Sequence, residues 1–288
     1  MKVLHGVSKS FCALCLVDRP LKESHIVPAF VVRHLTETSA TGFLTQPGSQ
    51  KRIQDGPKEA LLCEDCEQRF GRWERTFSIE AFPKIQSEEF DCFEYDQWLL
   101  KLAVSLAWRA LVTDSEEVIA ANPKWRSAIE ATLENWRSYL LDRIKKPLGS
   151  HHLFIVPGIP NQVPSNAHPK TLHYLLRACD AAVGVGSSLA VCVKLIRSIF
   201  YSPILPSDPS GWHGTRIHAG PGKIISAKQS IKSKDFSIHL DAVAALMSEP
   251  LSPKVVQQIV KSVSKNPNRL LTSETLQINL ATKNLWDM

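Results

Sequence analysis

Cys12-Ala13-Leu14-Cys15 and Cys63-Glu64-Asp65-Cys66 are the stretches that decide the fold of the N-terminal part of this 288-residue chain. Each joins two cysteines across two residues, a spacing that fits a tight knuckle with both sulfurs pointing inward. Two such knuckles supply four thiolates, a complete tetrahedral set for zinc at Zn–S distances of ~2.3 Å. The alternative, four buried free cysteines, would not favour the paired spacing. The sequence therefore predicts a structural zinc ion on Cys12, Cys15, Cys63 and Cys66.

A long segment, residues 16–62, lies between the knuckles, and Ser24-His25-Ile26-Val27-Pro28 stands near its start. A plain zinc ribbon has a shorter loop. The order of knuckle, histidine motif and second knuckle resembles the zinc-stapled branch of the HNH nucleases, over residues 10–76. The resemblance implies a ββα-metal (treble-clef-like) unit in which His25 is the general base and a helix follows from about Glu64 to Phe77.

Three positions depart from the family pattern. Ser24 stands where the family usually has an acidic residue or histidine, and Lys58 stands near the position of its metal-binding asparagine. Glu67 follows the fourth cysteine, where histidine or asparagine is common. We expect Glu67 and Asp55, with Glu74 as a further candidate, to hold catalytic Mg²⁺ or Mn²⁺, because these hard cations prefer oxygen ligands.

The resemblance implies a metal-dependent endonuclease that hydrolyses phosphodiester bonds of DNA or RNA, with His25, Glu67 and Asp55 as its catalytic set. His25 would deprotonate a water while the ion stabilises the phosphate and the leaving 3′ oxygen. It also implies a place in an anti-phage system, with a protein partner there. The alternative is a non-catalytic zinc module that binds nucleic acid or protein, with His25 as a core residue. The neutral Ser24 and the missing asparagine favour this alternative.

Candidate phosphate contacts lie on the expected metal-site helix. Arg69, Arg72 and Arg75 recur every three residues, and Arg69 and Arg72, together with Lys58, are the predicted nucleic-acid-binding residues. Pairing of these arginines with neighbouring glutamates is an equally good interpretation. The formal net charge is +6, but residues 1–80 carry eleven Lys and Arg against ten Asp and Glu. A phosphate-binding surface must therefore come from folding or from the C-terminal part.

The rest of the chain predicts an α+β protein in three parts: residues 1–90, an HNH-like zinc module; residues 91–146, a helical region; and residues 147–288, a β-rich domain with C-terminal helices. Tyr95 to Val112 is strongly apolar, and Asn122-Pro123 has the chemistry of a helix start. The tryptophans of these helices are expected in the core rather than as base-stacking platforms. Beyond Pro147, we expect strands at His152–Val156, Thr171–Cys179 and Thr215–His218 and one long central strand at Leu189–Tyr201. A short helix is also expected at residues 29–38, with Phe30, Val31 and Leu35 on its apolar side, and helix returns over residues 237–264.

Three features favour a cytoplasmic protein without a membrane segment. No apolar run approaches the ~20 residues needed to cross a bilayer. The N-terminus lacks the apolar core of a signal peptide. Of seven cysteines, Cys92, Cys179 and Cys192 are scattered singly, which suits a reducing compartment better than a disulfide framework.

Overall fold

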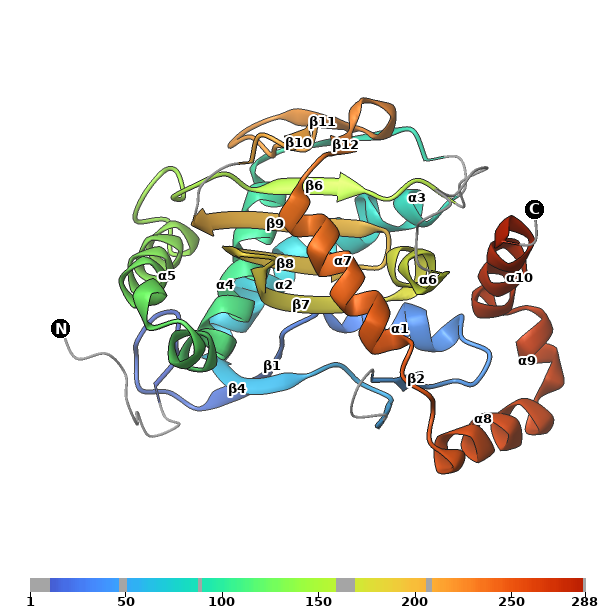
Figure 1. Cartoon of the computed structure of the whole chain (residues 1–288). Helices are drawn as coiled ribbons and strands as arrows, with labels where there is room; N and C mark the ends of the chain where they lie inside the picture. Colours follow the sequence, from blue (N-terminus) through green and yellow to red (C-terminus); the bar gives the residue numbers. More distant parts are fainter. Residues whose placement is uncertain (1–10, 47–50, 88–89, 159–168, 206–208, 287–288) are drawn as a thin grey trace.

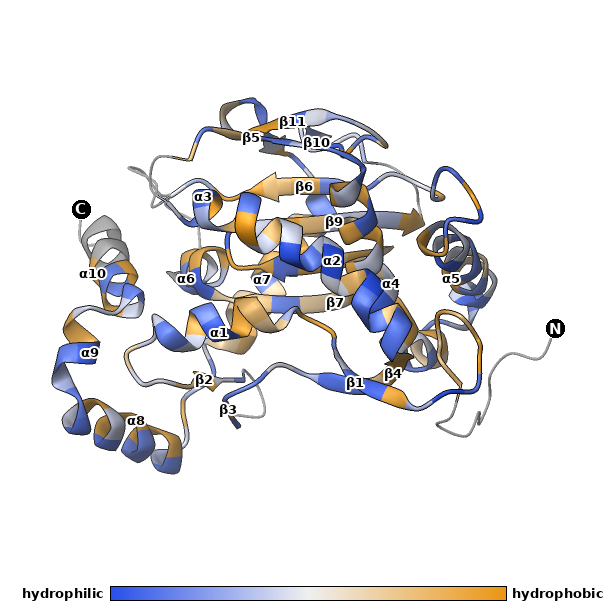
Figure 2. Cartoon of the chain, turned by 180° about the vertical axis from the view of Figure 1, so that it is seen from behind, coloured by the Kyte–Doolittle hydropathy of each residue, from blue (hydrophilic) through white to orange (hydrophobic). Residues whose placement is uncertain are grey.

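The structure, a computed structural model, describes residues 11–46, 51–87, 90–158, 169–205 and 209–286. At its centre is a four-stranded antiparallel sheet in the order β6-β9-β8-β7. Helix α7 (Lys234–Met247) lies across one face (Figure 1). Helices α2 (Glu64–Glu80) and α4 (Gln97–Ala121) cover the other, where the strands are mostly hydrophobic (Figure 2). The chain is thus a mixed α+β protein, as its sequence predicts.

Both faces of the central sheet are buried. The strands are β6 (His152–Ile155), β7 (Cys179–Val185), β8 (Ser188–Leu195) and β9 (Ser198–Leu205), and every residue of β8 is buried. Because side chains alternate along a strand, Val191 and Val193 join the core on the α4 side, while Ala190 and Cys192 join the one that includes Phe236 of α7. A strand buried on both faces carries a continuous apolar run instead of an alternating pattern.

Three of the predicted strands are wrong. Thr215–His218 is not a strand, because it contributes only an isolated bridge between Arg216 and His152. The run Leu189–Tyr201 is not one strand, because the chain turns at Ile196 (φ 59°) and Arg197 and returns as β9. Arg197 donates to the carbonyls of Val156 and Ser87, which compensates for its burial at the turn. The predicted strand Thr171–Cys179 is mostly helix α6 (Pro169–Arg177), because Pro169 occupies the first turn and apolar side chains then recur at helical spacing.

The N-terminal part is an antiparallel strand pair followed by a helix. β1 (Leu21–His25) pairs with β4 (Lys58–Cys63), and α2 begins at the next residue. Between the strands lie α1 (Ala29–Glu37) and a small hairpin of β2 (Leu44–Thr45) and β3 (Arg52–Ile53). The predicted helices near residues 29–38 and 64–77 are confirmed.

The predicted helical region, residues 91–146, holds α4, the short helix η1 (Pro123–Trp125) and α5 (Arg126–Leu140), and α3 (Phe82–Gln86) lies just before it. Trp108 and Trp136 are each 1% exposed, so these two are core residues.

Two small strand pairs lie around the edge of the central sheet. β5 (Cys92–Tyr95) pairs with β11 (Gly222–Ile225), and β10 (Trp212–His213) pairs with β12 (Ser230–Ile231). The short helix η2 (Ser226–Lys228) lies between β11 and β12 in the chain. One cluster of buried residues runs from Cys12 through α4 to Ile224.

A C-terminal arm returns to the N-terminal part. It consists of α8 (Pro253–Lys265), α9 (Pro267–Leu271) and α10 (Glu274–Trp286), and it runs along one side of the molecule (Figure 1). Arg269 donates to the carbonyl of Thr36 in the last turn of α1 at 2.5 Å and to that of Ser39 just past the helix at 2.9 Å. Carbonyls at a helix C-terminus lack partners within the helix, so these bonds attach the arm to α1. No helix in the described segments combines the length and apolarity that crossing a bilayer requires.

Candidate metal centre and histidine site

The first cysteine pair forms a compact knuckle attached to β4. Cys12 N–H donates to the Val17 carbonyl at 3.0 Å, and Leu16 N–H donates to the Cys12 carbonyl at 2.8 Å. Leu16 takes a left-handed backbone conformation (φ 61°) that closes this turn. Ala13 N–H donates to the Leu61 carbonyl at 3.0 Å, so the knuckle is fixed beside the end of β4.

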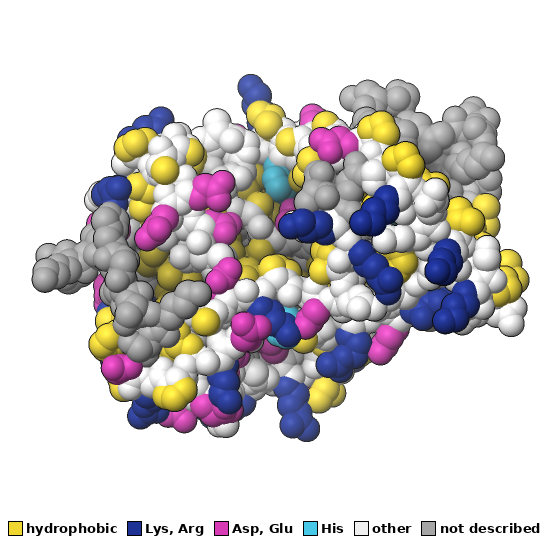
Figure 3. Space-filling model, turned by 90° about the horizontal axis from the view of Figure 1, so that it is seen from below, with side chains coloured by type: hydrophobic (Ala, Val, Ile, Leu, Met, Phe, Trp, Pro, Cys, Tyr) yellow, Lys and Arg dark blue, Asp and Glu magenta, His cyan; other side chains and the backbone are white. Residues whose placement is uncertain are grey.

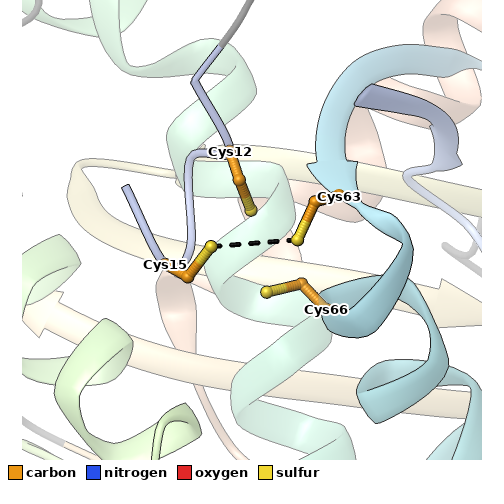
Figure 4. A group of neighbouring side chains, drawn as sticks. All are labelled: Cys12, Cys15, Cys63 and Cys66. Atoms are coloured by element: carbon orange, nitrogen blue, oxygen red, sulfur yellow. Dashed lines mark hydrogen bonds between the residues drawn. The ribbon is translucent and has the colours of Figure 1, made fainter. Parts of the chain in front are cut away.

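The four predicted cysteine ligands converge. Their Sγ atoms all lie within 4.8 Å of one another, and those of Cys15 and Cys63 are 3.8 Å apart (Figure 4). Neighbouring sulfurs around tetrahedral zinc are separated by ~3.8 Å when Zn–S is ~2.3 Å. The cluster can therefore hold a metal ion such as zinc, and four thiolates would leave that ion no open coordination position.

The close approach of the four sulfurs shifts their pKa values in opposite directions. Hydrogen bonding with Cys66 lowers the pKa of Cys12, against the opposing effect of burial. The same hydrogen bond raises the pKa of Cys66, and burial raises that of Cys15. Without a metal ion the cluster thus favours one thiolate, whereas metal ligation requires deprotonated sulfur at every ligand.

His25 ends β1, and its side chain contacts Asp55. Nε2 of His25 lies 2.8 Å from Oδ1 of Asp55, and the imidazole remains 22% exposed. Lys58 and then His25 hold the pKa of Asp55 well below its usual range, so this carboxylate is ionised at neutral pH. An ionised carboxylate only accepts hydrogen bonds, so Nε2 carries the proton and Nδ1 is left with its lone pair.

Three charged residues surround this histidine–aspartate pair. Lys58, opposite His25 in the strand pair, binds the other carboxylate oxygen of Asp55 at 2.5 Å. Arg109 of α4 donates to the His25 backbone carbonyl at 2.7 Å and pairs with Glu74 of α2 at 2.5 Å. Glu74 is therefore already paired with a cation, and the main chain that carries His25 is attached to α4.

Glu67 is not brought together with His25 and Asp55. Among the described residues, the cysteines are the one group of three or more His, Cys, Asp or Glu whose ligand atoms lie within 4.8 Å of one another. A buried oxygen of Glu67, Oε1, has no hydrogen-bond partner in this part of the chain. Ser24 is 1% exposed, and its hydroxyl likewise lacks a described partner.

The predicted phosphate-binding cations have different surroundings. Arg69 pairs with Asp142 at 2.5 Å and donates to the Leu140 carbonyl, so its partner is not a glutamate of its own helix. The Arg72 side chain is exposed and has no ion pair among the described residues. Lys58 is paired with Asp55.

Arg109 is the residue that sequence reasoning missed. It interrupts the apolar run of α4 and is 1% exposed. A charged residue in a buried helix requires a partner, so the signal was present in the sequence. Its partners, Glu74 and the His25 carbonyl, are far away in the chain and only folding brings them together.

Comparisons with protein families, curated proteins and solved structures found no match to this chain.

Proposed function

We propose that this protein is an HNH-type endonuclease in which His25 is the general base and Asp55 positions it. The single observation that carries the proposal is the 2.8 Å contact between His25 Nε2 and Asp55 Oδ1 on a partly exposed face. The chain order also supports it, because a strand pair bearing the histidine leads directly into α2 beside a four-cysteine cluster. This is the order of a zinc-stapled ββα-metal unit, with zinc as its structural ion.

In this proposal, Asp55 acts by holding the imidazole of His25 in one tautomer. With the proton on Nε2 donated to Asp55, Nδ1 accepts a proton from a water molecule as that water attacks phosphorus and the bond from phosphorus to the leaving 3′ oxygen breaks. The ionised carboxylate then stabilises the imidazolium that forms. Lys58 pairs with the other carboxylate oxygen of Asp55, and Arg109 holds the His25 backbone in place.

A catalytic Mg²⁺ or Mn²⁺ ion would have to bind with help from the substrate. Glu67 offers a buried oxygen without a partner, but its ligand atoms do not converge with those of His25 and Asp55. Asp55 already binds Lys58. These residues do not form a metal site by themselves, so no step is assigned to the ion. Substrate phosphate oxygens would have to complete any coordination shell, as is usual for Mg²⁺.

A basic surface suited to a nucleic acid lies on the C-terminal arm. The segment from Pro250 to Ser273 has no acidic residue, and Lys254, Lys261 and Lys265 on α8 are exposed. Figure 3 shows basic side chains gathered at this end of the molecule, whereas acidic and basic side chains are mixed near the middle. Exposed lysines on one surface are suited to contact a phosphate backbone. The defence role implied by family resemblance has no residue to support it and is not part of the proposal.

The test is cleavage of supercoiled plasmid by wild type and His25→Ala, with Mg²⁺, with Mn²⁺ and with a chelator. His25→Ala should reduce cleavage by ~10²–10⁴-fold, the usual contribution of a general base. His213→Ala is the matched control, since His213 is an exposed histidine on β10. Equal cleavage by His25→Ala and His213→Ala would exclude His25 as the base.

A non-catalytic zinc module is the second candidate. It is favoured by the absence of a third ligand beside His25 and Asp55 in the described chain. For this function, the wild type would bind DNA and leave it intact with every metal. Glu67→Gln separates the two further, because it should change metal dependence only if Glu67 is a ligand.

A further inference from the structure

A cavity of about 360 Å³ lies between α2, the start of α4 and the turn after α5. Its lining includes Arg69, Arg72, Trp73, Trp98, Lys101 and Asp142. We propose that this cavity binds one nucleotide unit, with the base against tryptophan and the phosphate on the cations. The unit can be a free nucleotide or part of a single strand, because both offer the same base and phosphate.

The cavity is rich in positive charge. Its lining contains three cations, Arg69, Arg72 and Lys101, and one carboxylate, Asp142. Lys101 is 5% exposed, an unusual position for a lysine, and lies 3.9 Å from the centre of the Tyr139 ring. Positive groups held in a partly enclosed space attract an anion more strongly than the same groups do in open solvent.

The Asp142 carboxylate binds two of these cations, Arg69 and Lys101, where the phosphate of a ligand would bind. Its two oxygens lie 2.6 Å from Lys101 Nζ and 2.5 Å from Arg69 Nη1. Two carboxylate oxygens shared between two cations resemble the way phosphate oxygens are bound. The Asp142 side chain is 61% exposed, so an incoming phosphate can reach the same cations by exchanging with it.

The backbone conformation at Asp142 allows the carboxylate to be removed by substitution without disturbing the turn. Asp142 has φ 61°, its N–H donates to the Tyr139 carbonyl, and Arg143 N–H donates to Ser138. This is the helix-ending motif in which a left-handed residue, usually glycine, follows the last turn. Asp142→Gly therefore removes the carboxylate at a position where glycine is the preferred residue.

The other side of the cavity can recognise a base. Trp73 and Trp98 both line it and are both half-buried, so their rings are partly available. Every base presents a flat face that stacks on an aromatic ring. Arg72, which has no ion-pair partner in the described chain, completes the site as a cation free to bind phosphate. A cavity of this size lies within the usual range for small-molecule sites.

The test is binding without cleavage, so it is independent of the nuclease proposal. Adenosine monophosphate, adenosine, inorganic phosphate and a short single-stranded oligothymidylate are titrated in chelator, followed by tryptophan fluorescence and calorimetry. We expect adenosine monophosphate or the oligonucleotide to bind at least 10-fold more tightly than adenosine or phosphate alone. Tighter binding of the mononucleotide indicates a free ligand, and tighter binding of the oligonucleotide indicates a strand.

Variants make the test specific. Arg72→Gln should weaken binding about 10-fold, while Arg75→Gln, the same change at an exposed position of α2, should not. Asp142→Gly should tighten binding several-fold, provided that circular dichroism shows a folded protein. Absence of binding by the wild type and by Asp142→Gly would overturn the proposal. So would equal binding by Arg72→Gln and Arg75→Gln, or an Asp142→Gly variant that binds no more tightly than wild type.

Discussion

Arg109 donates a hydrogen bond of 2.7 Å to the backbone carbonyl of His25, 84 residues earlier in the chain. The same guanidinium binds Glu74 on α2, so one buried side chain joins β1, α2 and α4. The proposed base is thus held by α4 in the buried core, although it lies on the strand pair beside the cysteine knuckles.

Arg109→Gln should destabilise the fold strongly. The Arg109 side chain is 2% exposed and that of Glu74 is 20% exposed, so the substitution leaves a largely buried carboxylate without its cation. Breaking a buried ion pair in this way typically costs ~3–5 kcal/mol. Urea unfolding measures the change, and Arg75→Gln, the same substitution at an exposed arginine of α2, is the control. Equal stability of the two variants would mean that the Arg109 contacts contribute little.

Asp55→Asn should lower cleavage without unfolding the protein. Asparagine can still accept a hydrogen bond from Nε2, but it cannot balance the charge of an imidazolium. Groups that orient a functional histidine typically contribute ~10–100-fold, so kcat should fall by that amount. Lys58→Gln, which removes the other partner of Asp55, should leave kcat within a few-fold of wild type. The positioning role is refuted by an Asp55→Asn enzyme with unchanged kcat.

The parts of the fold that follow short-range rules could be predicted. The cysteine spacing predicts a four-sulfur cluster, and α1 and α2 begin near the expected residues. Asn122-Pro123 likewise precedes the start of the short helix η1 and then α5. In each case, residues close in sequence decide the outcome.

The features that could not be predicted are the β8–β9 turn and the contacts between residues far apart in the sequence. They depend on the burial of each strand and on how distant segments of the chain pack together. The strands β8 and β9 are buried on both faces, so the apolar run continues through their turn and reads as one strand. The contact of His25 with Asp55 depends on how residue 55 lies against β1, which no local pattern specifies. The pairing of Arg69 with Asp142 likewise joins two segments 73 residues apart.

Cys63→Ser should remove the metal and the folded N-terminal part together. Structural zinc sites contribute on the order of 10 kcal/mol to the folding of small domains, and three thiolates form an incomplete set. Elemental analysis should give one zinc per wild-type chain and much less for Cys63→Ser. Cys92→Ser, which alters a cysteine outside the cluster, should retain the metal. A folded wild-type protein without metal would contradict the assignment.

Replacing Lys261 and Lys265 by glutamine should weaken DNA binding and make the affinity depend less steeply on salt concentration. Each phosphate contact contributes about 0.9 to the slope of log affinity against log salt for duplex DNA, so the slope should fall by almost two. The control is the pair Lys145→Gln and Lys146→Gln, which removes the same charge from exposed positions after α5, at the other end of the molecule (Figure 1). Equal slopes for the two double variants would show that α8 is not the DNA surface.

His151 should make the protein less stable as pH falls below about 6.5. Burial lowers the pKa of His151 to about 3 from its ordinary 6.5, with His152 adding to the effect. Between these values the unfolded chain binds a proton that the folded protein does not, so stability is full above pH 6.5 and declines towards pH 3. One such proton changes the unfolding free energy by up to ~1.4 kcal/mol per pH unit. His151→Asn keeps an amide that can hydrogen-bond Ser202. In urea unfolding at pH 4.5–6.5, it should reduce the slope of the unfolding free energy against pH by up to ~1.4 kcal/mol per pH unit, the contribution of one proton. An unchanged slope would show that His151 is protonated in the folded protein or that other groups dominate.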